Sequence, residues 1–309
     1  MRDHNEDAAV LAVVSAASDV DASFWEWHRI ADTLEEVGSA IRVISGDWDG
    51  FEPEVAHRLH HDAISGGAPT KIQDYQSMLR TLNDEGYQLT TITDRSYPSN
   101  LRMIFNRPPF LFVQGSIEAC DRRSVAIVGT RNASPEGRDT AAEISAGLTR
   151  QGVTIISGMA LGIDTEAHLA CLDSGGITIA VAGTGIRITY PPANADLRSL
   201  IAQKGAVVSQ FWPDAPPRPF HFPMRNIVTS GLSVATVVIE AGKTSGARNQ
   251  ARRALEHGKH LFLMRTLVET QEWAAKYSER PRTAAVETAD EIIGILDEVL
   301  TPPDQLTLT

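Results

Sequence analysis

Cysteine is scarce in this chain of 309 residues, which contains only Cys120 and Cys171. The two lie far apart and lack metal-ligand spacing, so the sequence predicts neither a disulfide framework nor a zinc site. Uninterrupted apolar runs are also short, well below the ~20 residues that span a bilayer. The apolar run near the N-terminus has acidic flanks and no basic segment before it, which favours a helix over a signal peptide. We therefore expect a cytoplasmic protein without a membrane span.

Aromatic residues and positive charge are sparse as well. Phe, Trp and Tyr make up 6% of the chain, and 28 Lys and Arg stand against 39 Asp and Glu, for a formal net charge of -11. Phosphate contacts by basic side chains supply most of the affinity in non-specific duplex binding, so this charge argues against that function. Any nucleic-acid site must be local, built from backbone N–H groups and a few arginines, because distant charges are screened over about 8 to 10 Å.

The N-terminal part of the chain has a helical pattern. Residues 1–85 carry apolar residues at helical spacing and no strand-like run, which predicts a small helical domain whose last helix covers 72–85. Trp25, Trp27 and Trp48 fall in this region. They are typical of a small buried core, and the alternative is that they anchor a protein partner.

The longer part, 86–300, alternates short apolar runs with helical stretches, and a polar tail follows at 301–309. Runs that are apolar throughout are expected of parallel strands covered on both faces by helices. The sequence therefore predicts an α/β domain with a doubly wound, mostly parallel sheet. Two further helices are expected around the last run. The predicted strands lie within 88–91, 110–114, 124–129, 153–158, 177–183, 206–210, 235–241, 260–264 and 283–286.

Residues that follow the strands are the candidates for a site, because ligands of such sheets bind at the carboxyl ends of the strands. The run at 124–129 ends in Gly129, Thr130 and Arg131, and Ser134 and Pro135 then suit an N-cap and a first helical position. Free N–H groups and the arginine fork favour a phosphate there. The alternative is a routine capped turn with a solvated arginine.

The next strand leads into Ser157, Gly158 and Met159, followed by Asp164 and His168. Glycine lets the backbone approach a ligand closely. Asp164 and His168 would lie one helical turn apart, which suggests a metal or acid-base pair, but no third ligand accompanies them. A structural hydrogen bond that orients the turn is the favoured interpretation.

Gly183 and Gly185 follow the third of these strands, but the third glycine of a dinucleotide fingerprint is missing, so NAD is a weak hypothesis. Tyr190 either stacks on a base or packs against the two prolines after it.

Arg225 and Asn226 precede a later strand, and Lys243, Ser245 and Gly246 follow it at a helix N-terminus. The second stretch is similar to a P-loop, but valine stands where the first glycine of that motif belongs, so ATP hydrolysis is not expected.

Five motifs occur in order over about 120 residues. They are Gly-Thr-Arg at 129–131, Ser-Gly-Met-Ala-Leu-Gly-Ile-Asp at 157–164, Gly-Thr-Gly-Ile at 183–186 with Tyr-Pro at 190–191, Phe-Pro-Met-Arg-Asn at 222–226 with Gly-Leu-Ser at 231–233, and Glu-Ala-Gly-Lys-Thr-Ser-Gly at 240–246. Together they resemble the DNA-processing protein A family (DprA, also called Smf).

The resemblance implies an extended Rossmann-like fold that binds single-stranded DNA at the strand ends, forms a homodimer and hands the strand to the recombinase RecA in natural transformation or related recombination. It implies no catalysis and no cofactor. Taken with the strand-end turns, it gives a predicted phosphate-binding site of Gly129, Thr130, Arg131, Ser134, Ser157, Gly158, Met159, Gly183, Arg225, Asn226, Lys243, Ser245 and Gly246.

Three departures mark the chain as a divergent member. Ile227 stands where the family usually has a second arginine, and Gln210 where it has a glutamate. The segment 264–266 lacks the expected Pro-Gly turn, and the Gly-Thr-Asn stretch after it is also missing. Fewer positive contacts are therefore expected.

The loss of the second arginine and the acidic charge leave a second hypothesis open, a phosphoribohydrolase-like enzyme or nucleotide sensor. Asp164, His168 and Glu240 would then be the acid-base candidates.

Overall fold

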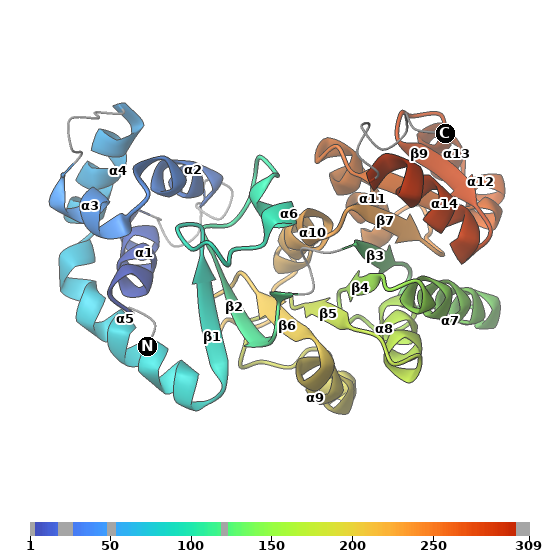
Figure 1. Ribbon diagram of the computed structural model, residues 1–309, viewed down its shortest axis with the longest axis horizontal. Helices are drawn as coiled ribbons and strands as arrows, with labels where there is room; N and C mark the ends of the chain where they lie inside the picture. Colours follow the sequence, from blue (N-terminus) through green and yellow to red (C-terminus); the bar gives the residue numbers. More distant parts are fainter. Residues whose placement is uncertain (1–3, 18–26, 48–53, 119–122, 301–309) are drawn as a thin grey trace, which may run out of the picture.

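A nine-stranded sheet organises the computed structural model, which describes residues 4–17, 27–47, 54–118 and 123–300 (Figure 1). The strands are β1 (Tyr87–Thr91), β2 (Phe110–Gly115), β3 (Ser124–Val128), β4 (Thr154–Ser157), β5 (Thr178–Val181), β6 (Ala206–Ser209), β7 (Ala235–Val238), β8 (His260–Met264) and β9 (Thr283–Val286).

The order across the sheet is β1-β2-β6-β5-β4-β3-β7-β8-β9. All pairs from β6 to β9 are parallel, whereas β1 pairs with β2 and β2 with β6 in antiparallel fashion. The predicted mostly parallel α/β sheet is therefore confirmed. Successive strands step outward from β3 toward β6, and the chain then returns to place β7 on the other side of β3. This reversal between β3 and β7 is the topological switch point, where open α/β sheets bind ligands.

The central strands are buried throughout and mostly apolar because both of their faces are covered. On β3, Val125 and Ile127 belong to one hydrophobic core and Ala126 to the other. Side chains alternate between the faces of a strand, so a strand buried on both sides has no solvent-facing row of polar residues.

Helices of the α/β part cover both faces of the sheet (Figure 1). Ser134 caps one of them through a hydrogen bond from the Gly137 N–H at 2.9 Å, with Pro135 as the first helical residue, as predicted. Between β8 and β9 there are two short helices where one was expected, because Gln271 adopts an extended conformation. The helices are α6 (Ser99–Arg102), α7 (Pro135–Arg150), α8 (Ile163–Asp173), η2 (Pro192–Asn194), α9 (Ala195–Lys204), α10 (His221–Leu232), α11 (Gly246–Glu256), α12 (Arg265–Thr270), α13 (Glu272–Ser278) and α14 (Ala289–Leu300).

The N-terminal helices lie against the β1 end of the sheet and share a hydrophobic core with it (Figure 1). Trp27 is buried, as expected of a small core, and its ring centroid lies 5.1 Å from that of Phe110. The last helix starts earlier than predicted because Pro69 fits the first helical turn and does not end it. These helices are α1 (His4–Ala17), α2 (Trp27–Val37), α3 (Ala40–Ser45), α4 (Glu54–Ser65) and α5 (Ala68–Asp84).

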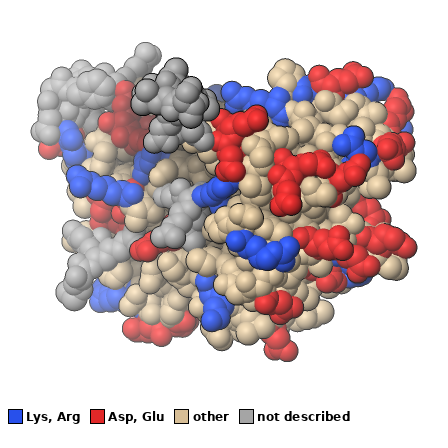
Figure 2. Space-filling view, turned by 45° about the vertical axis from the view of Figure 1, so that its right-hand side comes forward, with Lys and Arg blue, Asp and Glu red and all other residues tan. Residues whose placement is uncertain are grey.

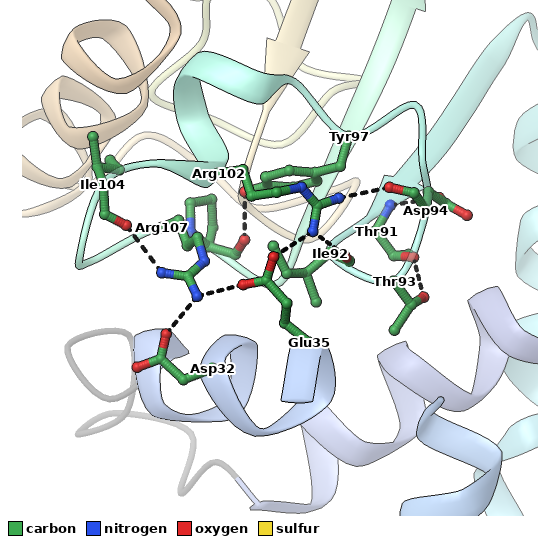
Figure 3. Close-up of polar contacts among 11 residues, drawn as sticks. Asp32, Glu35, Thr91, Ile92, Thr93, Asp94, Tyr97, Arg102, Ile104 and Arg107 are labelled. Atoms are coloured by element: carbon green, nitrogen blue, oxygen red, sulfur yellow. Dashed lines mark hydrogen bonds and ion pairs between the residues drawn. The ribbon is translucent and has the colours of Figure 1, made fainter. Parts of the chain in front are cut away.

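An ion-pair cluster joins α2 to the end of α6 and to the segment between α6 and β2 (Figure 3). The Glu35 carboxylate accepts hydrogen bonds from Arg102 Nη1 and Arg107 Nη2, both at 2.6 Å. Arg102 also donates to the carbonyls of Ile92 and Asp94, at 2.8 and 2.7 Å. Each arginine thus bridges segments that are distant in the sequence, which fixes the N-terminal helices on the sheet.

Trp25, Trp48, Cys120 and the predicted tail at 301–309 lie outside the described residues. Within the described part of the chain, no helix combines the length and the apolar character needed to cross a membrane. The boundary between two domains near residue 85 stays a prediction.

Candidate functional site

A cavity of about 380 Å³ lies at the switch point of the sheet. The turns after β3 and β4, the first half of α10 and the loop that leads into α11 surround it. The polar groups and glycines predicted from separate stretches of sequence therefore meet, because β3 and β7 are neighbours. Its lining comprises Val128, Gly129, Thr130, Arg131, Asn132, Gly158, Ala160, Asp164, Phe222, Pro223, Arg225, Asn226, Thr229, Gly242, Thr244, Ser245, Gly246, Ala247, Asn249 and Gln250.

Arg131 supplies an exposed positive charge at the mouth of this cavity. It stands in the turn after β3, and its guanidinium carbon lies 5.2 Å from the centre of the Phe222 ring. A cation over an aromatic face is held by the ring quadrupole while its N–H donors stay available. The Phe222 ring therefore orients Arg131, and among the described contacts no internal ion pair neutralises its charge.

Arg225 supplies a second positive charge, at the floor of the cavity. It is 8% exposed, because α10 is buried along most of its length, and its Nη1 donates to the Val181 carbonyl at 3.0 Å. Burial lowers the pKa of Arg225, and the nearby Asp164 carboxylate opposes that shift. Burial likewise raises the pKa of Asp164 against the charge of Arg225. The two groups carry opposite charges, influence each other's pKa and both line the cavity.

The N-terminus of α11 forms the opposite wall. Ser245 is its N-cap and accepts a hydrogen bond from the Ala247 N–H at 3.2 Å. The Asn226 side chain contacts this end through Nδ2, which lies 3.4 Å from the Gly246 carbonyl and 3.3 Å from Asn249 Oδ1. The first N–H groups of a helix have no intrahelical acceptor and carry partial positive charge, so this wall favours an anion.

A smaller recess of about 90 Å³ adjoins the cavity. Gly183 and Tyr190 line it on one side and Phe222 on the other, and the two ring centroids lie 5.7 Å apart. The Tyr190 ring packs against Phe222, and because the residue is 39% exposed, part of it remains accessible to solvent. A planar group can be stacked at this position.

The structure places the predicted site residues in three settings. Ser157 and Met159 are buried beneath the surface, and the Ser157 hydroxyl donates to the Ile127 carbonyl at 2.6 Å. Ser134 is engaged as the α7 cap, and Lys243 is exposed beside the cavity but not in its lining. Gly183 lines the smaller recess, and the larger cavity is lined by Gly129, Thr130, Arg131, Gly158, Arg225, Asn226, Ser245 and Gly246.

Sequence reasoning missed Asn132, Phe222, Thr229, Asn249 and Gln250 as lining residues. Phe222 was within reach, because it opens the Phe-Pro-Met-Arg-Asn motif. Asn249 and Gln250 lie one turn into α11, and only the helix position relative to β3 brings them to the cavity. Whether any of these residues contacts a ligand stays a prediction.

The three acid-base candidates do not converge. His168 is fully buried, its Nδ1 lies 2.6 Å from Thr178 Oγ1, and burial lowers its pKa to about 3. The Glu240 carboxylate is bound to Ser134, at 3.0 Å from both its N–H and its hydroxyl. Only Asp164 lines the cavity, and it accepts a hydrogen bond from the Ala160 N–H at 3.3 Å, in agreement with an orienting role. Among the described residues, no group of three His, Cys, Asp or Glu side chains is arranged to hold a metal ion.

The family model for DNA recombination-mediator protein A matches residues 88–296, more than half of the chain. The chain belongs to this family. The resemblance to DprA and Smf proteins is therefore confirmed, and the match includes every motif on which it was based.

Curated DprA and Smf proteins are similar in sequence over much of the chain. The DNA processing protein DprA of Streptococcus pneumoniae is 40% identical over 172 residues, which cover 56% of this chain and 61% of that protein. Protein Smf of Synechocystis is 34% identical over 245 residues, 78% of this chain and 60% of that protein. The chain thus spans about 60% of the length of these curated relatives.

Two solved DprA structures share the fold. The structure of DprA from Streptococcus pneumoniae superposes with a TM-score of 0.70 at 26% identity and covers 95% of this chain and 98% of that one. The structure that describes the single-stranded DNA binding mode of DNA processing protein A from Helicobacter pylori has a TM-score of 0.61 at 25% identity, and covers 69% of this chain and 96% of that one. The predicted Rossmann-like fold is confirmed by these likenesses.

Proposed function

We propose that this chain binds single-stranded DNA and holds its phosphates in the cavity at the switch point. The observation that carries the proposal is the convergence of Arg131, Arg225 and the N-terminus of α11 on one cavity. Arginine and helix N-termini are the groups that bind phosphate oxygens most readily in proteins. A phosphate in the cavity would also add a second anion beside the buried charge of Arg225.

A single strand fits this surface better than a duplex. In the view of Figure 2, Lys and Arg occur singly or in small groups between Asp and Glu, over a molecule with a net charge of -11. Duplex affinity depends on many phosphate contacts, whereas a single strand also gains from the stacking of its bases on aromatic rings. Tyr190 and Phe222 in the adjoining recess offer such rings.

The proposed phosphate contacts are the predicted residues that line the cavity and its recess, whereas Ser134, Ser157, Met159 and Lys243 would support these residues from beside or beneath the cavity; no catalytic step is proposed. Membership of the DprA family and the likeness to DprA structures support a cytoplasmic homodimer that assists loading of the recombinase RecA in transformation or recombination. The N-terminal helical domain and the α/β domain would act together in that role. A nucleotide hydrolase is the less favoured function, because His168 and Glu240 are directed to structural partners.

Titration of the full chain with fluorescently labelled poly-dT at several salt concentrations tests the proposal. We expect measurable affinity that falls as salt rises, with a slope of about 0.7 for each phosphate contact. Arg131→Ala should weaken binding by about 10-fold, since a hydrogen bond to a charged group is worth roughly 1.5 to 3 kcal/mol.

Arg138→Ala is the matched control, because Arg138 pairs with Glu166 at 3.0 Å and does not line the cavity. Equal affinities of the two variants would show that the cavity is not the binding site. Absence of poly-dT binding together with release of free base from a nucleoside monophosphate would instead support the hydrolase.

A further inference from the structure

The turn that presents Arg131 is fixed from two sides, and Glu240 fixes one of them. Glu240 follows β7, the strand next to β3, and does not line the cavity. Its carboxylate belongs to none of the contacts invoked for phosphate binding. Its role must therefore be sought in the turn itself.

Glu240 holds the turn at both of its ends. Its backbone carbonyl accepts from the Thr130 N–H at 2.7 Å, just before Arg131. Its Oε2 atom accepts from the N–H and from the hydroxyl of Ser134, both at 3.0 Å, just after Arg131. The Ser134 hydroxyl in turn accepts from the Gly137 N–H at 2.9 Å, which connects the carboxylate to the first turn of α7.

The other side of the turn rests on the start of α8. The Thr130 carbonyl accepts from the Ile163 N–H at 3.3 Å, and a Cβ on Gly162 would lie 2.5 Å from that carbonyl oxygen. The backbone around Arg131 therefore has contacts from β7 and from α8, while its side chain extends toward Phe222. These contacts determine where the guanidinium enters the cavity.

The carboxylate also occupies the N-terminus of α7. A Cβ on Gly137 would lie 2.1 Å from Glu240 Oε2, so the space at this helix end is filled. The Ser134 N–H at this helix end is satisfied by the internal anion, and the Gly137 N–H by the Ser134 hydroxyl. Of the two helix N-termini that follow β3 and β7, only that of α11 lines the cavity.

We propose that Glu240 is a positioning residue for Arg131, and that its carboxylate keeps phosphates of the strand off the first turn of α7. The strand then binds between Arg131 and the N-terminus of α11. This inference rests on the proposed function, since it concerns the same cavity.

The two roles of the carboxylate have opposite effects on affinity. Ser134 is three positions after Arg131 in the chain, so the negative charge lies on the order of 10 Å from the Arg131 backbone, close enough to repel a bound phosphate. Electrostatics alone predicts that loss of this charge strengthens binding. A positioning role predicts that loss of the hydrogen bonds weakens it.

Three variants separate these effects in the poly-dT titration. Glu240→Gln keeps an oxygen acceptor for Ser134 and removes the charge, so we expect affinity equal to or above that of the wild type. Glu240→Ala removes both the charge and the acceptor and should weaken binding by about 10-fold or more, in the range expected for the loss of a charged hydrogen bond. Glu136→Gln, on the exposed face of the same helix turn, is the control and should match the wild type or bind slightly more tightly. Tighter binding by Glu240→Ala would overturn the proposal.

Amide hydrogen exchange of the DNA-free protein gives an independent readout. The amides of Thr130, Ser134 and Gly137 should exchange faster in Glu240→Ala than in Glu240→Gln, and Ser134→Ala should speed exchange at Gly137 alone. Unchanged exchange in Glu240→Ala would contradict the positioning role even if the wild type binds DNA. If the variants show the expected exchange differences but the wild type does not bind DNA, the proposed function is refuted and the role of Glu240 in the turn is retained.

Discussion

The guanidinium of Arg225 occupies the space that a side chain on Gly158 would need. A Cβ built on Gly158 would lie 1.5 Å from Arg225 Nη1. Because residue 158 has no side chain, the Arg225 guanidinium can lie against the turn after β4. From there its Nη1 donates to the carbonyl of Val181, the last residue of β5, at 3.0 Å. A glycine in one motif and an arginine in another thus depend on each other, although 67 residues separate them.

Gly158→Ala should displace Arg225 and weaken poly-dT binding by about 10-fold, comparable to the loss of one charged phosphate contact. The backbone at Gly158 is outside the left-handed region, so the clash with Arg225 is the cause of the effect. Gly242→Ala is the control, because Gly242 also lines the cavity and its Cβ would meet no described atom within 4 Å. Equal affinities of the two variants in fluorescence polarisation would refute the coupling.

Glu35→Ala should lower the free energy of unfolding by about 1 to 2 kcal/mol, measured by urea denaturation, because it leaves Arg102 and Arg107 without a shared acceptor. Burial acts to raise the pKa of Glu35, but the two arginines outweigh it and lower the pKa overall. The stabilisation by the Glu35 carboxylate is therefore fully present above the ordinary carboxyl pKa, and it is lost as the pH falls through the lowered pKa of Glu35 in the folded protein.

Glu36→Ala is the control for this ion-pair cluster, since Glu36 is the exposed neighbour on the same helix. Its unfolding free energy should stay within about 0.5 kcal/mol of the wild type. A difference between the two variants that stays constant as the pH falls through the acidic range would contradict the assignment to the carboxylate charge.

The strands were predictable because each obeys a local rule. The apolar runs at 124–129 and 260–264 contain β3 and β8, and the cap Ser134 with Pro135 marked the start of α7. The run at 283–286 is β9 with the predicted bounds. These signals depend on burial of both faces and on capping chemistry, which a few neighbouring residues determine.

The interior of the site was not predictable in the same way. Nothing near Glu240 in the sequence indicates that it binds Ser134, and nothing near Gly158 indicates that Arg225 fills its space. Both relationships follow from the strand order, in which β7 lies beside β3. Pairing between distant strands is a property of the whole sheet. Local patterns therefore identified the individual site residues but did not show which of them contact each other.

His168 should make the protein less stable in acid. Burial, with a smaller contribution from the charge of Arg225, lowers its pKa to about 3 from an ordinary value of 6.5. Below pH 6.5 the unfolded chain binds a proton that the folded chain excludes, so stability is lost as the pH falls toward 3, by at most about 1.4 kcal/mol per pH unit. Urea denaturation between pH 7 and pH 5 should show a shallower decline for His168→Gln. His61→Gln, whose parent side chain is 78% exposed, is the control, and parallel curves for both variants would contradict the prediction.

Arg248 should stabilise the loop that leads into α11. Its Nη1 donates to the Lys243 carbonyl at 3.1 Å, and its guanidinium carbon lies 5.9 Å from the centre of the Trp273 ring on α13. The helices α12 and α13 stand where the family pattern expects the Gly-Thr-Asn segment, and this contact connects α13 to the first turns of α11. Because Ser245 follows that loop and caps α11, a loosened loop would disturb the helix N-terminus that faces the cavity.

Arg248→Ala should therefore speed amide exchange at Ser245, whose N–H donates to the Gly242 carbonyl at 3.1 Å. It should weaken poly-dT binding by only about 3-fold, because Arg248 acts through the loop and not on the phosphate. Arg252→Ala removes an arginine of the same helix that pairs with Glu256 at 3.5 Å, so it loses equal charge without contact to the loop. If only the charge mattered, both variants would lose the same affinity. A loss confined to Arg248→Ala, with faster exchange at Ser245, assigns the effect to the loop, because the net charge of the two variants is identical.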